Sequence, residues 1–502
     1  MSGSNQPVHL AIDLGASGGR VLGGRITDDG IALDELHRFT NGPVPLGKRL
    51  VWNLLGQWEN IMEGLGAAGA KYGDQIASVG ADTWGVDYVL LDRNDDQAGP
   101  CFCYRDARIR GMLDKGFERM PRSKIFAHTG LQFMEINSAY QLLAMRLEKS
   151  PILDIAERFL MVPDYLHWQL SGEKVNEFTN ASTTQLLNPS TCTWAEPVMD
   201  AFEIPPHLFS EPARPGANLG SLTDAVRNRT RLGKEVQVIL PATHDTGSAV
   251  LAVPASSFAP AEPDWCYISC GTWSLMGAEI PKPILSDDCQ KFNFTNEGGV
   301  QGSVRLLKNI AGLWIVQQCR EQWKREGKEL SWDRLTQLAE EAPSMVSIID
   351  PDDDLFIAPD SMPEAIREFC SKTNQPQPST EGEIIRCALE SLVLRYRMVL
   401  GYLEHLVGRE IKTIHMVGGG VQNQLLCQLT ADACQKQVIA GPVEATALGN
   451  VLMQAIGTGE LSSIEDARSL IRKAKDIATY DPKPHGQWDA GYEKLKGFAN
   501  AS

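Results

Sequence analysis

The chain has 502 residues, more than one typical hydrophobic core accommodates and enough for two domains. A formal net charge of −16 argues against broad binding to nucleic acid or to an anionic membrane, because both need clustered Lys and Arg. No apolar run approaches the roughly 20 residues of a membrane-spanning helix, and residues 1–7 lack a secretory signal pattern, so we expect a cytoplasmic protein. The eleven cysteines show no paired spacing typical of structural zinc sites.

The N-terminal residues predict strands that are joined by tight turns. Apolar residues alternate over 8–14, and small residues fill 15–19. A second strand pattern covers 20–26, and a turn follows at 28–30. This order predicts a β-meander whose first hairpin tip is rich in glycine.

A helix and further strands follow the meander. One face of the helix is expected to carry the apolar residues Leu55, Trp58, Ile61, Met62 and Leu65. Strands are predicted at 76–80 and 236–240, and each leads into polar residues at its carboxyl end. This mixture of helices and strands predicts an α/β domain.

The stretch 253–263 is rich in Pro, Ala and Ser and predicts a linker between an N-terminal domain, 1–252, and a C-terminal domain, 264–482. The second domain opens as the first does, with a strand pattern at 265–269, a small-residue turn and another apolar run at 273–280. This similarity predicts an internal repeat of architecture.

The C-terminal domain contains a predicted βαβ unit after a long helix at 384–406. The glycines 418–420 lie at the carboxyl end of a strand, where open α/β sheets bind ligands. The elements of the unit are a strand at 412–417, a helix at 425–433, a strand at 437–440 and a further helix from Glu444.

Two small-residue tips, one per domain, are suited to hold phosphate. The first follows Asp13, which can hold Mg²⁺ through waters, and offers backbone N–H groups and a cation. Its candidate residues are Ala16, Ser17, Gly18, Gly19 and Arg20. The second tip, 269–273, offers the Thr272 hydroxyl. Either tip alone is also what an ordinary hairpin needs, and their pairing favours a phosphate site.

Asp245 follows the strand at 236–240, within Thr243-His244-Asp245-Thr246. A carboxylate at a strand end in a cleft can accept the proton of a hydroxyl group that attacks a γ-phosphoryl group. The alternative is that Asp245 is the N-cap of the following helix, and the two roles are compatible.

The segment 82–87, Asp82-Thr83-Trp84-Gly85-Val86-Asp87, suits a sugar, which needs close backbone approach, hydrogen bonds and an apolar face. The alternative is a buried tryptophan in a hairpin. The polar clusters 104–106, 295–299 and Lys308-Asn309 are open to both kinds of interpretation.

Together these motifs resemble the FGGY family of carbohydrate kinases over about residues 8–461. The most specific matching pieces are 82–87, 243–246, 271–277, 296–299 and 440–445. The resemblance implies two ribonuclease H-like domains of the actin and hexokinase type with an ATP cleft between them. It implies phosphorylation of a ketose at its primary hydroxyl with ATP and Mg²⁺. Rhamnulose, in rhamnose catabolism, is expected first, and fuculose or xylulose is the alternative.

The resemblance also implies roles for single residues. Asp245 matches the proton acceptor, and residues 16–20 match the first phosphate loop. The nucleotide contacts are Thr272, Gln317 and Gly419, and the ketose contacts are Gly85, His244, Asp245, Thr246 and Asn309. The N-terminal domain would mainly bind the sugar and the C-terminal domain the nucleotide. Ketose and ATP would be the partners, without nucleic acid or membrane, in a monomer or small homo-oligomer.

The chain departs from the family at several positions. Gly18 and Cys270 stand where relatives often have Ser, so those hydroxyl contacts are missing. Cys370 and Cys387 match cysteines that pair in some relatives, but a reducing compartment disfavours the bond. A second pair in relatives ends at the position of Cys434, but Thr430 stands in place of its partner here, so that bridge cannot form.

A function of a different class uses the same fold. ATP-driven chaperones and filament proteins hydrolyse ATP without phosphorylating a small molecule, so a non-kinase actin-like ATPase is the alternative. Such a protein has no need of Trp84 and His244 in its cleft.

Overall fold

The computed structural model describes residues 6–259, 261–357, 359–483 and 486–499, so Pro260 of the predicted linker lies outside the described residues. The chain divides into two compact units. Unit 1 comprises Met1–Glu262, Glu279–Leu306 and Ala445–Ala474, and unit 2 comprises Pro263–Ala278, Leu307–Glu444 and Lys475–Ser502. Unit 1 therefore includes two segments that follow the predicted linker in the sequence.

The sheet of unit 1 has the strand order β13-β14-β6-β1-β2-β3. The strands β1 (Val8–Leu14), β2 (Gly18–Thr27) and β3 (Gly30–Thr40) are antiparallel neighbours, which confirms the predicted meander. On the other side of β1, β6 (Ile76–Thr83) and β14 (Gln237–Ile239) run parallel to it. The edge strand β13 (Asn218–Ser221) is antiparallel. The carboxyl ends of β1, β6 and β14 consequently lie at the same edge of the sheet.

Helices cover this sheet and bury its apolar residues. The helix α1 (Leu54–Tyr72) begins at Asn53, whose side chain accepts a hydrogen bond from the Gly56 N–H, and packs on β2 and β3. Leu55 is 74% exposed, so its predicted place on the buried face is wrong. Leu54 is buried instead, because seven residues, about two turns, separate it from the buried Ile61.

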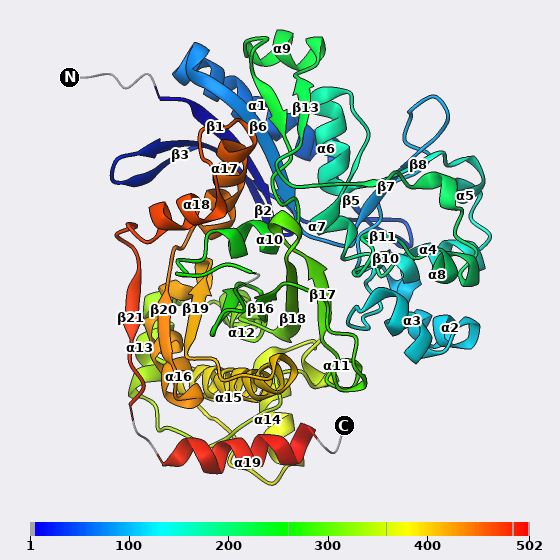
Figure 1. Ribbon diagram of the computed structural model, residues 1–502. Helices are drawn as coiled ribbons and strands as arrows, with labels where there is room; N and C mark the ends of the chain where they lie inside the picture. Colours follow the sequence, from blue (N-terminus) through cyan, green and yellow to red (C-terminus); the bar gives the residue numbers. More distant parts are fainter. Residues whose placement is uncertain (1–5, 260, 358, 484–485, 500–502) are drawn as a thin grey trace. The chain divides into compact units, whose positions relative to one another are not determined.

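The helix α17 (Ala445–Gly457) brings a late part of the sequence onto the first strands. It packs against β1, β2 and β6, and its orange colour beside these blue strands shows the separation in sequence (Figure 1). The short helix α10 (Asp245–Leu251) also packs against α17. The core of unit 1 thus depends on residues from both ends of the chain.

Unit 2 is built on a sheet that contains the strands β18-β16-β15-β19-β20-β21 in this order. The strands are β15 (Trp265–Cys270), β16 (Trp273–Ile280), β18 (Val304–Ala311), β19 (Thr413–Val417), β20 (Gln437–Ala440) and β21 (Ala478–Tyr480). As in unit 1, the central strand has an antiparallel partner on one side and two parallel strands followed by an antiparallel one on the other. The shared topology confirms the predicted repeat of architecture.

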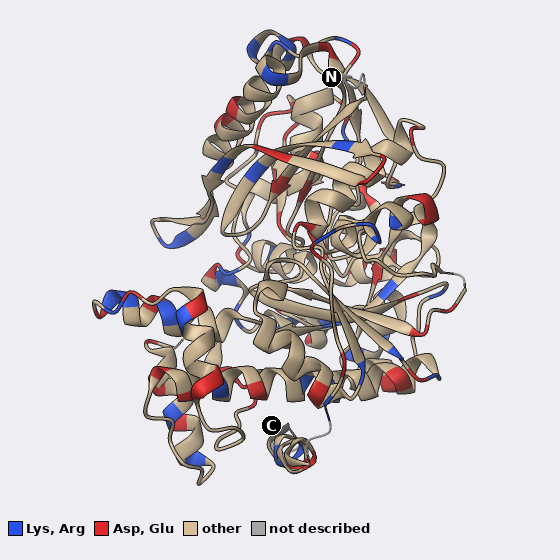
Figure 2. Ribbon diagram, turned by 90° about the vertical axis from the view of Figure 1, so that its left-hand side faces the viewer, with Lys and Arg blue, Asp and Glu red and all other residues tan. Residues whose placement is uncertain are grey.

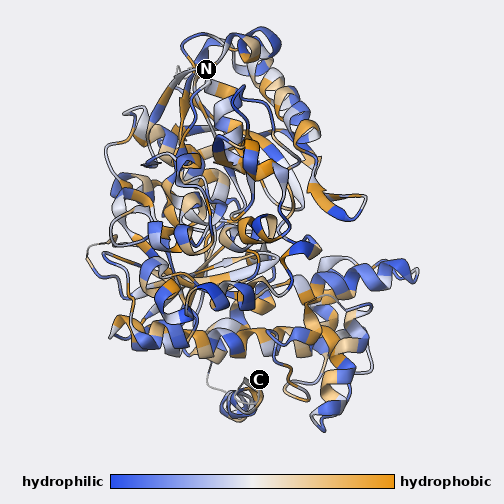
Figure 3. Cartoon of the chain, turned by 90° about the vertical axis from the view of Figure 1, so that its right-hand side faces the viewer, coloured by the Kyte–Doolittle hydropathy of each residue, from blue (hydrophilic) through white to orange (hydrophobic). Residues whose placement is uncertain are grey.

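The helices of unit 2 confirm the predicted helices at 384–406 and 425–433, whereas the helix predicted from Glu444 is α17 of unit 1. The helix α15 (Glu381–Val407) starts at a capping box formed by Thr380 and Glu383 and ends at Gly408 in the left-handed conformation. It packs against α16 (Gln424–Cys434) and α19 (Gln487–Ala499). Figure 3 shows apolar and polar residues alternating along the helices, as helices on a sheet require.

Charged residues of both signs lie interspersed along the exposed helices (Figure 2). Ion pairs follow from this pattern, as between Lys372 and Glu368, whose charged atoms are 2.6 Å apart. Among the described residues, no helix is both long and apolar enough to cross a membrane.

Candidate functional site

Three carboxylates lie at neighbouring strand ends of unit 1. Asp13 of β1 is aligned with Asp82 of β6 in the parallel register. Thr83, the last residue of β6, forms a bridge with His244, and Asp245 comes next. The structure thereby brings together Asp13, Asp82 and Asp245, which the sequence placed in three separate motifs. Among the described residues, no three His, Cys, Asp or Glu side chains are grouped so as to bind a metal directly.

The first predicted phosphate tip is a tight turn between β1 and β2. The Gly15 N–H donates to the Gly18 carbonyl at 2.9 Å, and the Asn41 side chain donates to the Gly15 carbonyl at 2.8 Å. Ser17 is exposed at the tip. Arg20 donates from Nη2 to Asp13 Oδ2 at 2.5 Å, so the predicted cation and the predicted magnesium ligand form an ion pair.

Asp82 is fully buried and is held by a residue that the sequence analysis did not select. Asn450 of α17 donates from Nδ2 to Asp82 Oδ2 at 2.5 Å, whereas Asp82 Oδ1 has no hydrogen-bond partner among the described residues. Burial and then the neighbouring Asp13 carboxylate raise the pKa of Asp82 well above its usual range.

Asn450 belongs to a buried chain of polar side chains. Gln454 donates to Asn450 at 2.6 Å and accepts from Ser78 at 2.6 Å. His9 lies 2.7 Å from Ser78 on one ring nitrogen and 2.6 Å from Glu460 on the other. Polar residues four apart on an otherwise apolar helix, such as Asn450 and Gln454, were the available sequence signal.

Asp245 is the first residue of α10, and the N-cap is His244. The alternative in which Asp245 is the N-cap is therefore wrong. Its Oδ1 accepts from the Thr246 N–H at 2.6 Å, and its side chain is 34% exposed. Burial of the carboxylate raises the pKa of Asp245, although the adjacent His244 acts in the opposite direction. Asp245 thus combines access to solvent with an environment that favours holding a proton.

His244 connects Asp245 to a second charged pair. His244 Nε2 lies 3.4 Å from Asp245 Oδ1, and Nδ1 lies 3.2 Å from Glu297 Oε2. The Arg305 guanidinium is 3.1 Å from both Glu297 Oε2 and His244 Nδ1. Glu297 comes from β17 (Thr295–Gly298), within a cluster that the sequence analysis left unassigned.

The backbone around His244 is fixed by Glu177, which carried no sequence signal. Both Thr179 and Thr243 donate their hydroxyls to Glu177 Oε2 at 2.6 Å. Thr179 Oγ1 in turn accepts from the His244 N–H at 3.1 Å. Although the donors act in the opposite direction, burial raises the pKa of Glu177.

The segment 82–87 forms a packed corner of unit 1. Trp84 is 6% exposed and its ring centroid lies 4.2 Å from that of Trp52, so the alternative of a buried tryptophan describes its side chain. Asp87 accepts from both indole N–H groups, at 2.6 Å from Trp52 and 3.0 Å from Trp84. At Gly85 a Cβ atom would lie 3.0 Å from the Thr183 side chain, which limits this position to a small residue.

The predicted nucleotide residues of unit 2 gather at the ends of its central strands. The Gly271 and Thr272 carbonyls accept from the Leu313 and Trp314 N–H groups, at 3.1 and 3.0 Å. This ties the second tip to the start of α12 (Trp314–Arg325), which carries Gln317 in its first turn.

The glycines of the βαβ unit pack against the same tip. A Cβ atom at Gly420 would lie 2.3 Å from Cys270 Sγ, so the chain approaches Cys270 closely there. At Gly419 a Cβ atom would meet nothing within 4 Å. The structure thus brings together Thr272, Gln317 and Gly419. Asn309, a predicted ketose contact, lies in β18 and belongs to unit 2.

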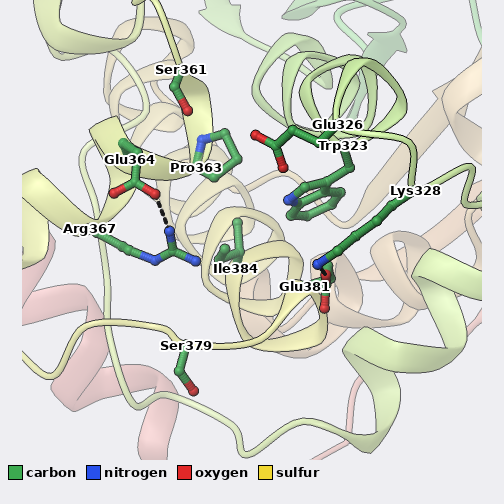
Figure 4. A pocket seen from close by; sticks show the side chains of 10 residues that line it. All are labelled: Trp323, Glu326, Lys328, Ser361, Pro363, Glu364, Arg367, Ser379, Glu381 and Ile384. Atoms are coloured by element: carbon green, nitrogen blue, oxygen red, sulfur yellow. Dashed lines mark hydrogen bonds and ion pairs between the residues drawn. The ribbon is translucent and has the colours of Figure 1, made fainter.

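A pocket elsewhere in unit 2 contains none of the predicted site residues (Figure 4). Four of its five charged side chains pair with one another: Lys328 Nζ donates to Glu381 at 2.6 Å, and Arg367 pairs with Glu364. Paired charges leave this pocket little attraction for a charged ligand.

The eleven cysteines are free thiols. Cys370 and Cys387, which pair in some relatives, are both buried in unit 2. A hydrogen bond from the Cys387 side chain lowers the pKa of Cys370.

Family models and known proteins match nearly the whole chain. The N-terminal domain of the FGGY family of carbohydrate kinases matches residues 8–252, and its C-terminal domain matches residues 266–458. A protein named Rhamnulokinase from Bacteroides thetaiotaomicron is 41% identical over 97% of this chain and 98% of its own length. One of the same name from Oceanobacillus iheyensis is 38% identical over 95% of this chain and 98% of its own.

Solved structures share the fold at low sequence identity. Gluconate kinase from Lactobacillus acidophilus aligns with a TM-score of 0.81 and 15% identity, over 99% of this chain and 98% of its own. Glycerol kinase from Plasmodium falciparum, solved with ADP, aligns with a TM-score of 0.77 and 15% identity, over 99% and 97%. The predicted fold class, two α/β domains of the actin and hexokinase type, is confirmed.

Proposed function

Because the chain belongs to the FGGY family of carbohydrate kinases, we propose that it transfers the γ-phosphoryl group of ATP to the O1 hydroxyl of rhamnulose. The products are rhamnulose 1-phosphate and ADP. Relatives at 38% and 41% identity carry the name Rhamnulokinase and align along almost their whole length, which supports this ketose. Family membership makes the protein a carbohydrate kinase, so the alternative of a non-kinase ATPase is set aside.

The position of Asp245 is the observation that carries the proposed mechanism. Its carboxylate is partly exposed beside His244 and has a raised pKa, which brings a proton acceptor closer to neutral pH. As O1 attacks the γ-phosphorus, the O1 proton passes to Asp245. The bond between the γ-phosphorus and the β–γ bridging oxygen breaks, and ADP leaves with the electron pair. Gly85, His244, Thr246 and Asn309 would bind the sugar.

Unit 2 supplies the nucleotide site in this proposal. Its gathered residues, Thr272, Gln317 and Gly419, would contact ATP, with Gly419 beside the adenosine. In unit 1, residues 16–20 would bind the phosphates through backbone N–H groups. Arg20, held by Asp13, would add positive charge near the transferred group.

Magnesium fits this site as an ion that is held through waters. Asp13 presents a carboxylate at a strand end, and Mg²⁺ commonly keeps several waters while bound by one or two carboxylates and substrate phosphates. When bound, the ion neutralises charge that develops on the phosphate oxygens. Asp13 would hold the ion through waters. The proposal also places the protein in the cytoplasm, where ATP is available.

A coupled ADP-release assay over rhamnulose, fuculose and xylulose tests the substrate. We expect the highest kcat/KM for rhamnulose. If another ketose exceeds it tenfold or more, about 1.4 kcal/mol of discrimination, the substrate assignment is wrong and the kinase assignment stands.

A further inference from the structure

His244 is buried between charged groups that come from different parts of unit 1. Its side chain is 9% exposed, and those of Glu297 and Arg305 are 6% and 1% exposed. Taking two charges out of water is costly, and apolar residues of similar size are often as stabilising as a buried ion pair. A charged pair at this position therefore calls for an explanation beyond stability.

One oxygen of the Glu297 carboxylate, Oε2, has no hydrogen-bond partner among the described residues. This atom lies within 3.1 to 3.2 Å of Arg305 Nη2 and His244 Nδ1 without a linear hydrogen bond. Burial opposes ionisation of Glu297, but Arg305 and His244 together lower its pKa below the usual value. A guanidinium only donates hydrogen bonds, so the hydrogen bond from Arg305 Nη2 to His244 Nδ1, at 3.1 Å, requires the unprotonated form of that ring nitrogen.

Arg305 is fixed independently of His244. Its Nε donates to the Gly298 carbonyl at 2.8 Å, and the Gly298 N–H donates to Ser182 Oγ at 2.7 Å. The guanidinium is thus anchored on β17, the strand that carries Glu297. Glu297 and Arg305 therefore form a fixed pair that contacts the imidazole ring of His244.

We propose that Glu297 and Arg305 are positioning residues that fix the orientation and tautomer of His244. Arg305 Nη2 donates to His244 Nδ1 at 3.1 Å, which leaves the ring proton on Nε2, and Glu297 holds Arg305 in place. Nε2 is thereby directed toward Asp245 Oδ1, 3.4 Å away, on the side where the ketose hydroxyl is expected. The imidazole is presented to the sugar in one arrangement rather than several. This inference rests on the proposed function of Asp245 and His244.

Glu297→Gln is the central variant, because it keeps the size of the side chain and removes its charge. Arg305 then loses its counter-charge, so its hydrogen bond to Nδ1 weakens and the ring proton is no longer confined to Nε2. The ketose dissociation constant, measured by calorimetry without ATP, should rise about 10- to 100-fold, as for partners that orient a binding residue. The ATP dissociation constant should stay within about twofold of the parent value.

Glu279→Gln is a matched control. Glu279 pairs with Arg468 at 2.7 Å, and the two side chains are 1% and 0% exposed in unit 1. The Glu279→Gln variant makes the same change of charge in an equally buried ion pair that does not contact His244. Its melting temperature should fall by a comparable amount, while ketose affinity stays unchanged.

The ¹⁵N chemical shifts of the His244 ring, assigned by their loss in His244→Asn, test the tautomer without any substrate. We expect a proton on Nε2 in the parent protein and a mixture of the two tautomers in Glu297→Gln. A proton on Nδ1 in the parent protein overturns the proposal, as does unchanged ketose affinity in a folded Glu297→Gln. If Glu297→Gln does not fold, Arg305→Lys is measured in the same way. Because the shifts need no turnover, failure of the proposed kinase reaction is distinguishable from failure of this inference.

Discussion

The two units place different residues at corresponding ends of the same sheet topology. The last antiparallel pair of the central strand is Leu14–Gly19 in unit 1 and Cys270–Ser274 in unit 2, so Asp13 corresponds to Ser269. The aligned residue of the parallel neighbour is Asp82 in unit 1 and Val417 in unit 2. One unit collects carboxylates at this edge, and the other has small or apolar residues. We infer that proton transfer depends on unit 1 and close approach of the nucleotide on unit 2.

Removing one unit 1 carboxylate is expected to have the largest effect. Asp245→Asn should lower kcat at saturating ketose and ATP about 10²- to 10⁴-fold, because the amide cannot accept the hydroxyl proton. ATP affinity and melting temperature should change little. Asp224→Asn is a matched control, since Asp224 is also the first residue of a helix in unit 1, α9 (Asp224–Thr230).

An Asp245→Asn protein that keeps more than about a tenth of the parent turnover would contradict this role, on the same scale. The proton acceptor would then be sought at Asp13 or Asp82, and the contrast between the two units would persist with a different carboxylate.

Adding a methyl group in unit 2 is expected to weaken ATP binding without changing ketose binding. Gly419→Ala meets no atom within 4 Å, so the fold should be unaffected, but the methyl group would occupy space beside the adenosine. We expect the ATP dissociation constant to rise about tenfold, roughly 1.4 kcal/mol, with no change in ketose affinity. Calorimetry with each ligand measures both. Gly401→Ala, an exposed glycine of α15 with equally open surroundings, should change neither.

The smallest expected effect is on the free energy of unfolding, through the buried Asp87 of unit 1. Burial raises the pKa of Asp87 to about 6, above the roughly 3.9 of an unfolded chain. Its contribution to stability is therefore complete below about pH 4 and is lost as the pH rises through 6. Urea unfolding should show about 1 kcal/mol less stability at pH 7 than at pH 5 relative to Asp87→Asn. Equal pH slopes for the two proteins would show that Asp87 does not titrate in this range.

Local patterns in the sequence were sufficient for most elements of both sheets. Alternation over residues 8–14 and the glycine-rich turn after it predicted β1 and the tip. The face of α1 was misassigned at Leu55, because adjacent leucines satisfy a helical period about equally well until packing selects one of them. The entry of Glu279–Leu306 and Ala445–Ala474 into unit 1 depends on long-range packing, which no local pattern records.

The site was predictable where a motif carries several of its residues together. Asp245 and His244 lie in one such motif, and the sequence placed both at a strand end. Glu177 and Asn450 act through contacts with residues 66 and 368 positions away in the chain. Neither has a neighbour in the sequence that reveals its partner. Contacts of this range become visible only in three dimensions.

The docking of α17 on β1 and β6 has a consequence for synthesis on the ribosome. The strands of this sheet leave the ribosome early, but Asn450, which holds Asp82, is made only after about nine-tenths of the chain. At about 5 to 20 residues per second, the first strands wait roughly 20 to 90 s for this helix. During that interval the β1–β6 face is uncovered and Asp82 lacks its partner. The nascent N-terminal part of the protein is thus expected to expose apolar surface until α17 has been made.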